Sequence, residues 1–214
     1  MKTLLTLLIA GAACVSADTL TFDGNNCAAD SSGIGAATPC FDLSAINQTY
    51  GDTAQVNVTY ADANFGVSLG YWGGGYNDLT GIVWAAGGDP GSFGRITLEL
   101  LIPGTITLNS LDMGAFPNTT LGTNLRIYGL GGGSPLYTFS GNVGTPPNAT
   151  PFSFSNISST NGLIIEWQNS AYNVGMDNID FTITPTATGV PEPSSMAILV
   201  LGAGGLLTVS RRRR

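Results

Sequence analysis

Hydrophobic and polar residues alternate with a period of two through most of the chain between Asp18 and Thr184. In residues 55–60, for example, two valines and a tyrosine alternate with glutamine, asparagine and threonine. A period of two sends successive side chains to opposite faces of a strand, so that one face can be buried. The pattern predicts further strands at residues 19–23, 65–69, 81–85, 95–102, 105–111, 124–130, 136–139, 152–154, 163–167 and 178–184.

Glycine- and proline-rich segments separate these predicted strands, and no amphipathic helix is evident between Asp18 and Thr184. Pro103-Gly104 predicts a tight turn between strands 95–102 and 105–111, because proline presets one backbone dihedral and glycine accepts a positive φ. We therefore expect an all-β fold, an antiparallel β-sandwich with nine to eleven strands in two sheets and a jelly-roll-like topology.

The first 17 residues have the pattern of a secretory signal peptide. Lys2 precedes an apolar run at residues 4–13, and small residues precede Asp18. This pattern predicts a signal helix that signal peptidase cleaves after Ala17. The alternative is a lipoprotein signal with Cys14 as the acylated residue, although the usual branched aliphatic residue is missing three positions upstream.

Composition changes again after the predicted β-sandwich domain at residues 18–184. Residues 185–189 form a Thr/Pro-rich linker, and residues 195–210 predict a single transmembrane helix. The 15 uncharged residues of Met196–Ser210 would span about 22 Å as a helix, less than the roughly 30 Å of a hydrocarbon core. The four arginines that follow should stay in the cytoplasm.

The segment at residues 190–214 has three parts in order: Val-Pro-Glu-Pro-Ser, a glycine-containing apolar run and an arginine cluster. This arrangement resembles the PEP-CTERM sorting signal of Gram-negative bacteria, which is also labelled an ice-binding protein C-terminal segment. The resemblance implies that an exosortase, a membrane-embedded transpeptidase, recognises Pro191, Glu192 and Pro193. It further implies an intermediate held at the inner membrane, delivery to the cell surface or extracellular matrix, and a connection with biofilm polysaccharide.

The predicted domain is strongly acidic. It holds 13 of the 14 acidic residues, only Arg95 and Arg126 as basic residues, and no histidine, which gives a net charge near −11. A nucleic-acid partner is excluded because phosphate binding needs clustered Lys and Arg. The usual general bases are also missing. Glu99 and Glu166 could act as a carboxylate pair in glycoside hydrolysis, but solvent-facing strand residues are the simpler interpretation.

Cys27 and Cys40 remain in the domain once Cys14 is removed with the signal peptide. An even pair of cysteines in an exported chain predicts a disulfide.

Three aromatic residues, Tyr71, Trp72 and Tyr76, lie in a glycine-rich stretch that also carries Asn77 and Asp78. Exposed aromatic rings can stack on sugars, and the two polar side chains can bind hydroxyl groups. The alternative is that Trp72 or Tyr76 packs beneath the loop as part of the core.

Residues 176–181 are rich in oxygen ligands of the kind that calcium prefers. They are similar to the last strand of many jelly-roll carbohydrate-binding modules, where an aspartate often holds a structural calcium ion. That resemblance makes Asp177 the candidate ligand and Asp23 its companion. The alternative is that Asp177 makes turn hydrogen bonds at the strand entry.

Together these patterns favour an exported, non-catalytic surface or matrix protein that is sorted by exosortase and binds extracellular polysaccharide. A secreted glycan-active enzyme that uses carboxylates and a purely structural matrix protein remain the alternatives.

Overall fold

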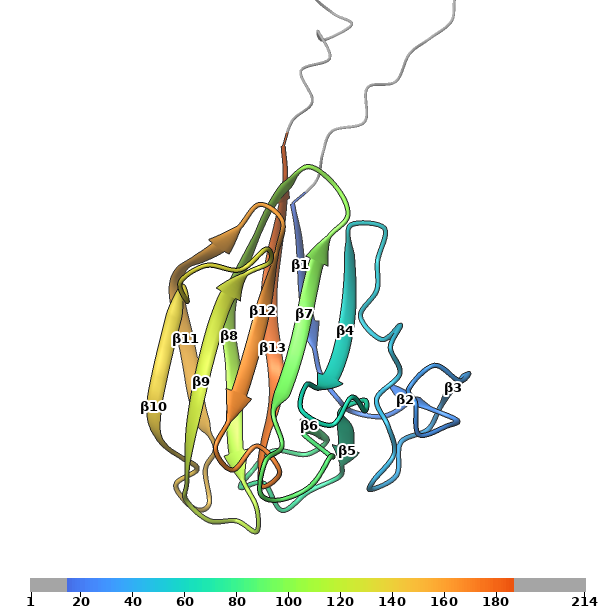
Figure 1. The fold of residues 1–214 in the computed structure, drawn as a ribbon, viewed down its shortest axis with the longest axis vertical. Helices are drawn as coiled ribbons and strands as arrows, with labels where there is room; N and C mark the ends of the chain where they lie inside the picture. The colour runs from blue at the N-terminus through green and yellow to red at the C-terminus, as the bar shows by residue number, and fades with distance from the viewer. Residues whose placement is uncertain (1–14, 187–214) are drawn as a thin grey trace, which may run out of the picture. The chain divides into compact units, whose positions relative to one another are not determined.

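The computed structural model describes residues 15–186, which form thirteen strands and no helix (Figure 1). Period-two alternation of buried and exposed residues explains why these segments are strands. Their bounds are β1 (Ser16–Leu20), β2 (Cys27–Ala28), β3 (Ala37–Thr38), β4 (Val56–Asp62), β5 (Gly70–Trp72), β6 (Ile82–Trp84), β7 (Gly94–Leu100), β8 (Gly104–Ala115), β9 (Leu121–Gly129), β10 (Tyr137–Val143), β11 (Thr150–Ser159), β12 (Gly162–Gln168) and β13 (Val174–Pro185).

Eleven of these strands form two antiparallel sheets that pack face to face (Figure 1). The six-stranded sheet has the order β11-β8-β13-β6-β5, with β1 also paired to β13. The five-stranded sheet has the order β10-β9-β12-β7-β4, and β2 pairs with β3 in a small separate sheet. The predicted antiparallel β-sandwich is therefore confirmed, and the chain passes repeatedly from one sheet to the other, as in a jelly roll.

The two strands that the predicted turn at Pro103-Gly104 joins do not pair with each other. Strand β7 belongs to the five-stranded sheet, whereas β8 belongs to the six-stranded sheet. The turn therefore crosses from one sheet to the other. Both strands bury one face against the same core, so their alternation is the same whether they pair with each other or face each other across the sandwich.

The strand predicted at residues 65–69 is also absent. Phe65 and Val67 are largely exposed, and Val67 makes only an isolated bridge with Asp62. The alternation of this short segment reflects a turn at the end of β4.

The core lies between the inner faces of the two sheets and includes the apolar positions that the alternation predicted. Trp167 on β12 is fully buried, and its indole N–H donates to the carbonyl of Val174 at 2.9 Å. The ring lies over Gly94, its partner on β7, where a Cβ atom would approach the indole to 2.3 Å. Only glycine therefore fits beneath this tryptophan.

The predicted disulfide is confirmed, because Cys27 and Cys40 are bonded in the structure. Cys27 begins β2, and Cys40 follows β3. The bond joins the two ends of the segment that carries the small sheet, in which each strand has only two residues.

The two predicted helices, at the signal peptide and at residues 195–210, lie outside the described residues. Within residues 15–186, no helix is long and apolar enough to cross a membrane. Strand β1 already includes Ser16 and Ala17, which pair with Ile183 and Thr182. Cleavage after Ala17 therefore stays a prediction, and it would leave only the second part of β1.

Candidate functional site

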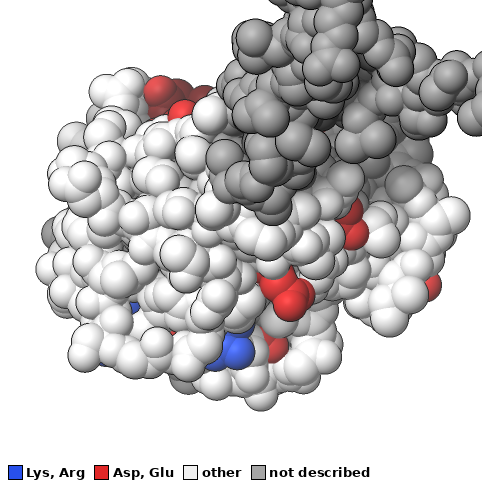
Figure 2. Space-filling view, turned by 90° about the horizontal axis from the view of Figure 1, so that it is seen from above, with Lys and Arg blue, Asp and Glu red and all other residues white. Residues whose placement is uncertain are grey.

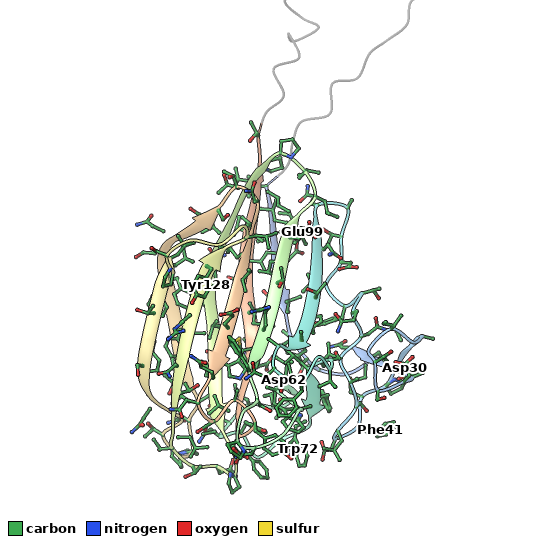
Figure 3. The ribbon with its side chains drawn as sticks, viewed as in Figure 1. Asp30, Phe41, Asp62, Trp72, Glu99 and Tyr128 are labelled. Carbon is green, nitrogen blue, oxygen red and sulfur yellow. A yellow bond between two sulfur atoms is a disulfide. The ribbon has the colours of Figure 1, made fainter. Side chains whose placement is uncertain are left out.

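Trp72 and Tyr76, from the predicted sugar-stacking stretch, lie in an aromatic cluster at one end of the sandwich (Figure 3). Trp72 is half-buried at the end of β5, with ring centroids 6.1 Å from Trp84 and 5.6 Å from Phe116. Tyr76 is 2% exposed, and burial raises the pKa of its phenol far above the usual value. Trp72 is thus the more accessible of the two rings.

The polar residues of the stretch hold neighbouring loops in place. The side-chain carbonyl of Asn77 accepts from the backbone N–H of Ala115 at 2.8 Å, and its amide donates to the carbonyl of Thr119. Asp78 accepts from the backbone N–H of Ala149 at 2.6 Å. The ligand-binding role predicted for Asn77 and Asp78 stays a prediction, and these bonds give both residues a position in the fold.

Tyr71 faces a different region, because successive residues of a strand point to opposite sides. It packs against the main core instead of the cluster that contains Trp72. Burial, together with the nearby acidic groups Asp42, Asp23 and Asp177, raises the pKa of its phenol. The structure therefore separates Tyr71 from the other two aromatic residues of the stretch.

An aromatic pocket of about 120 Å³ opens within the cluster. Tyr172 closes one side, with its ring 4.7 Å from Trp84 in an edge-to-face arrangement. The pocket is lined by Trp72, Tyr76, Trp84, Phe116, Tyr172 and Asn173.

A larger polar cleft, of about 670 Å³, adjoins this pocket because the two share Tyr172. Its wall combines amide, hydroxyl and carboxylate side chains with backbone. Asn173, which lines the pocket, donates to Asp89 in the cleft at 3.3 Å. The cleft is lined by Asn64, Asp89, Pro90, Gly91, Ser92, Asn124, Gln168, Asn169, Ser170, Ala171 and Tyr172.

A buried carboxylate, Asp62, fixes the loops on one side of the cleft (Figure 3). One oxygen accepts from the backbone N–H groups of Asn64 and Phe93 at 3.2 and 3.1 Å, and the other accepts from Gly87 at 3.0 Å. Asn64 in turn donates to the carbonyl of Gly91 at 2.7 Å. Because one side chain binds both loops, the shape of the cleft depends on Asp62.

Three amide side chains in the cleft are available to a ligand. Asn124 on β9 and Gln168 on β12 are cross-strand partners, and Asn169 follows β12 with a φ of 60°. None of these three side chains makes a hydrogen bond within residues 15–186. Each can therefore offer both a donor and an acceptor to a bound molecule.

Sequence reasoning missed most of this site. It placed Trp84 in the strand predicted at residues 81–85, but it did not select Phe116, Asn124 or Gln168. These residues are far from Trp72 in the sequence, and the crossing of strands between sheets brings them together. Only the asparagines and the tyrosine of the loop after β12 gave a local signal.

The two glutamates considered for catalysis, Glu99 and Glu166, both lie on the outer face of the five-stranded sheet. Glu166 pairs with Arg95, and Glu99 is four residues farther along the same strand as Arg95. Four residues of strand correspond to about 13 Å, whereas paired glycosidase carboxylates lie about 5–9.5 Å apart. Glu166 also accepts from Arg95 at 2.8 Å. The two carboxylates therefore do not form a closely spaced pair.

The two candidate calcium ligands lie close enough to interact. Asp177 is 4% exposed and accepts from the backbone N–H of Phe22 at 3.2 Å. Burial, together with the nearby charges of Asp23 and Asp112, raises the pKa of Asp177 to about 7. Calcium takes six to eight oxygen ligands, and residues 15–186 contain no group of three acidic, histidine or cysteine side chains placed to hold a metal. These side chains alone do not complete a calcium site, so calcium stays a prediction.

The sorting residues Pro191, Glu192 and Pro193 lie outside the described part of the chain. However, residues 189–214 match the family model of the PEP-CTERM protein-sorting motif. This match confirms the sorting signal predicted at residues 190–214. It covers the C-terminal segment and leaves the β-sandwich unassigned. No curated protein matches the chain.

The chain is similar to several solved structures. A CBM4 structure is 15% identical over 65% of this chain and 98% of its own, with a TM-score of 0.32. A family 11 carbohydrate-binding module from Clostridium thermocellum is 8% identical over 64% of this chain and 93% of its own, with a TM-score of 0.27. The enzymatically active domain of tailspike protein 4 from bacteriophage CBA120 is 11% identical over 70% of this chain and 22% of its own, with a TM-score of 0.35. At these identities the likeness concerns the β-sandwich alone.

Proposed function

We propose that this chain is an exported, non-catalytic protein whose β-sandwich binds polysaccharide at the polar cleft. The observation that carries the proposal is the junction at Tyr172, where an amide-lined cleft meets an aromatic pocket. Sugars present hydroxyl groups that both donate and accept hydrogen bonds, and they also present apolar C–H faces. Amide side chains can both donate to and accept from the hydroxyl groups, and an aromatic ring can pack against the C–H faces.

The sorting motif supports the rest of the proposal. A protein processed by exosortase is held briefly at the inner membrane of a Gram-negative bacterium and then delivered to the cell surface or extracellular matrix. Polysaccharide is abundant there, particularly in biofilm. A binding domain delivered to this location would link the protein to the matrix.

The test is binding of the purified full chain to a polysaccharide array, followed by titration calorimetry with each polymer that binds. Tyr172→Ala should weaken binding about 30-fold, because truncating a central aromatic contact typically costs about 2 kcal/mol. Gln168→Ala removes hydrogen bonds only and should weaken binding about 3- to 10-fold. Thermal unfolding of each variant checks that the fold is kept.

Phe41→Ala is the matched control. Phe41 is an aromatic residue that is 72% exposed and lines neither the pocket nor the cleft (Figure 3). This variant should bind like the wild type. Binding that survives Tyr172→Ala and Gln168→Ala unchanged would exclude the cleft as the site. Failure of the wild type to bind any polymer would favour a purely structural matrix protein.

The non-catalytic part of the proposal has its own test. Incubation of the full chain with each bound polymer should release no reducing ends. Hydrolysis that disappears in Glu166→Gln or Glu99→Gln would instead establish a carboxylate-dependent enzyme.

A further inference from the structure

A shallow polar depression continues the cleft along the outer face of β9 and β10. Its volume is about 370 Å³, and it shares Asn124 with the cleft. The depression is lined by Asn124, Arg126, Thr138, Phe139 and Ser140. The aromatic pocket, the cleft and the depression therefore form a connected path. Tyr172 lies where the pocket meets the cleft, and Asn124 lies where the cleft meets the depression. Such a path suits a linear polymer better than a single sugar.

The two arginines of the domain lie in one cross-strand row on this face. Arg126 on β9 is opposite Glu166 on β12, and Glu166 is opposite Arg95 on β7. Arg95 donates to one oxygen of Glu166 from two nitrogens, at 2.8 and 2.7 Å. Within residues 15–186, no carboxylate lies within 4.0 Å of a side-chain nitrogen of Arg126. Glu166 is therefore already paired with Arg95, while the exposed guanidinium of Arg126 keeps its donors for another partner.

An available cation is unusual in this domain, whose net charge is near −11. The view in Figure 2 shows a described surface that is mostly uncharged, with more acidic than basic atoms. The long-range field of such a domain repels polyanions, so an acidic polymer can bind only through a local positive group. A carboxylate can accept two parallel N–H bonds from a guanidinium, whereas a neutral hydroxyl group cannot.

We propose that the polysaccharide is acidic, and that Arg126 binds a carboxylate on a sugar unit while the cleft binds the neighbouring units. This inference rests on the proposed function and adds the chemical class of the ligand. The polymer would run from the aromatic pocket past Tyr172 and Asn124 to Arg126, with one charged unit placed over β9 and β10.

The test uses three carboxylated polymers, polygalacturonate, alginate and hyaluronate, each beside its carboxyl-reduced derivative. The full chain should bind at least one carboxylated polymer and bind its reduced form at least tenfold more weakly. Arg126→Gln should weaken binding of the carboxylated form about 10- to 100-fold, as expected for loss of a charge-assisted hydrogen bond. Binding of the reduced form should not change. Arg126→Lys keeps the charge but loses the planar fork, so it should restore only part of the affinity.

Thr59→Glu is the matched electrostatic control, because it changes the net charge by the same amount as Arg126→Gln. Thr59 is an exposed residue of β4, three strands from β9 on the same sheet, a distance of about 14 Å. That distance exceeds the screening length of about 10 Å at 0.1 M salt, so this variant should change affinity less than threefold.

The outcomes separate the two proposals. Binding that depends on Tyr172 but is the same for carboxylated and reduced polymers, or is unaffected by Arg126→Gln, would overturn the acidic ligand and leave polysaccharide binding intact. Equal losses in Arg126→Gln and Thr59→Glu would overturn the local contact with Arg126. Absence of binding to every polymer of the array, neutral or acidic, would overturn both proposals.

Discussion

Asp62 and Asp177 are both buried carboxylates, yet their surroundings differ. Asp62 accepts three backbone N–H groups, from two loops that border the cleft. Asp177 accepts from the backbone N–H of Phe22, and its burial, together with the charges of two nearby acidic residues, raises its pKa to about 7. A buried charge can thus be stabilised by donors placed around it, or it can favour its neutral form. The first arrangement organises the site, and the second leaves a pH-sensitive position between the first and last strands.

The largest expected effect comes from Asp62→Ala. Each hydrogen bond to a charged group contributes about 1.5–3 kcal/mol, so loss of three should lower the free energy of unfolding by about 5 kcal/mol. Urea denaturation measures this change. Because both loops lose their common partner, polysaccharide binding should fall as well.

Asp30→Ala is the control for this substitution, since Asp30 lies on the exposed segment between β2 and β3 (Figure 3). It should unfold at a urea concentration close to that of the wild type. If Asp62→Ala behaves like Asp30→Ala, Asp62 does not organise the loops.

A smaller effect on the free energy of unfolding is expected for Asp177→Asn. At high pH this substitution should stabilise the fold, whereas Asp62→Ala destabilises it. The folded state keeps a proton on Asp177 up to about pH 7, whereas the unfolded state loses it near pH 4. The folded state therefore binds more protons in this interval, and the free energy of unfolding should fall as the pH rises from about 4 to 7. The full pKa shift of Asp177 would change the free energy of unfolding by about 4 kcal/mol as an upper limit.

Asparagine keeps the oxygen that accepts from Phe22 but cannot ionise. Asp177→Asn should therefore equal the wild type near pH 4 and exceed it at pH 8, as measured by urea denaturation at both pH values. An identical pH dependence in the two proteins would show that Asp177 titrates normally.

The smallest effect is expected from calcium, which could bind beside the buried carboxylate of Asp177. If Asp23 and Asp177 take part in a calcium site, calcium at pH 8 should offset the unfavourable buried charge and raise the melting temperature by about 2–4 °C. EDTA should reverse the change, and Asp177→Asn should not respond. A wild-type melting temperature that is the same in calcium and in EDTA would rule out the predicted calcium site.

Local patterns predicted the strands well because burial of one strand face is recorded in every second residue. Ile96 and Leu98, for example, are fully buried, as their alternation indicated. The pairing of strands was harder to predict, because apolar and polar residues alternate in the same way in β7 and β8 although these strands belong to different sheets. The ion pair of Arg95 with Glu166 joins residues 71 positions apart, and no local pattern could predict it.

The candidate site was even harder to predict from local sequence patterns. Sequence reasoning selected Trp72 because three aromatic residues in a glycine-rich stretch are difficult to bury together. It left the orientation of each ring open, and the structure buries Tyr76, turns Tyr71 toward the main core and leaves Trp72 at the pocket. The partners that complete the site, Tyr172 and Gln168, come from the other end of the domain sequence.

Features that depend on neighbouring residues or on composition could be predicted from the sequence: the β-class of the fold, the cysteine pair, the acidic charge and the sorting signal at residues 190–214. The folded chain was needed to show which strands face each other, which carboxylates are buried, and that Tyr172, Asn124 and Arg126 follow one path. The physical reason is that alternation and motifs are local, whereas a cleft forms where distant strands and loops meet. The residues that line a cleft must lie close together in space, but they need no regular spacing along the chain.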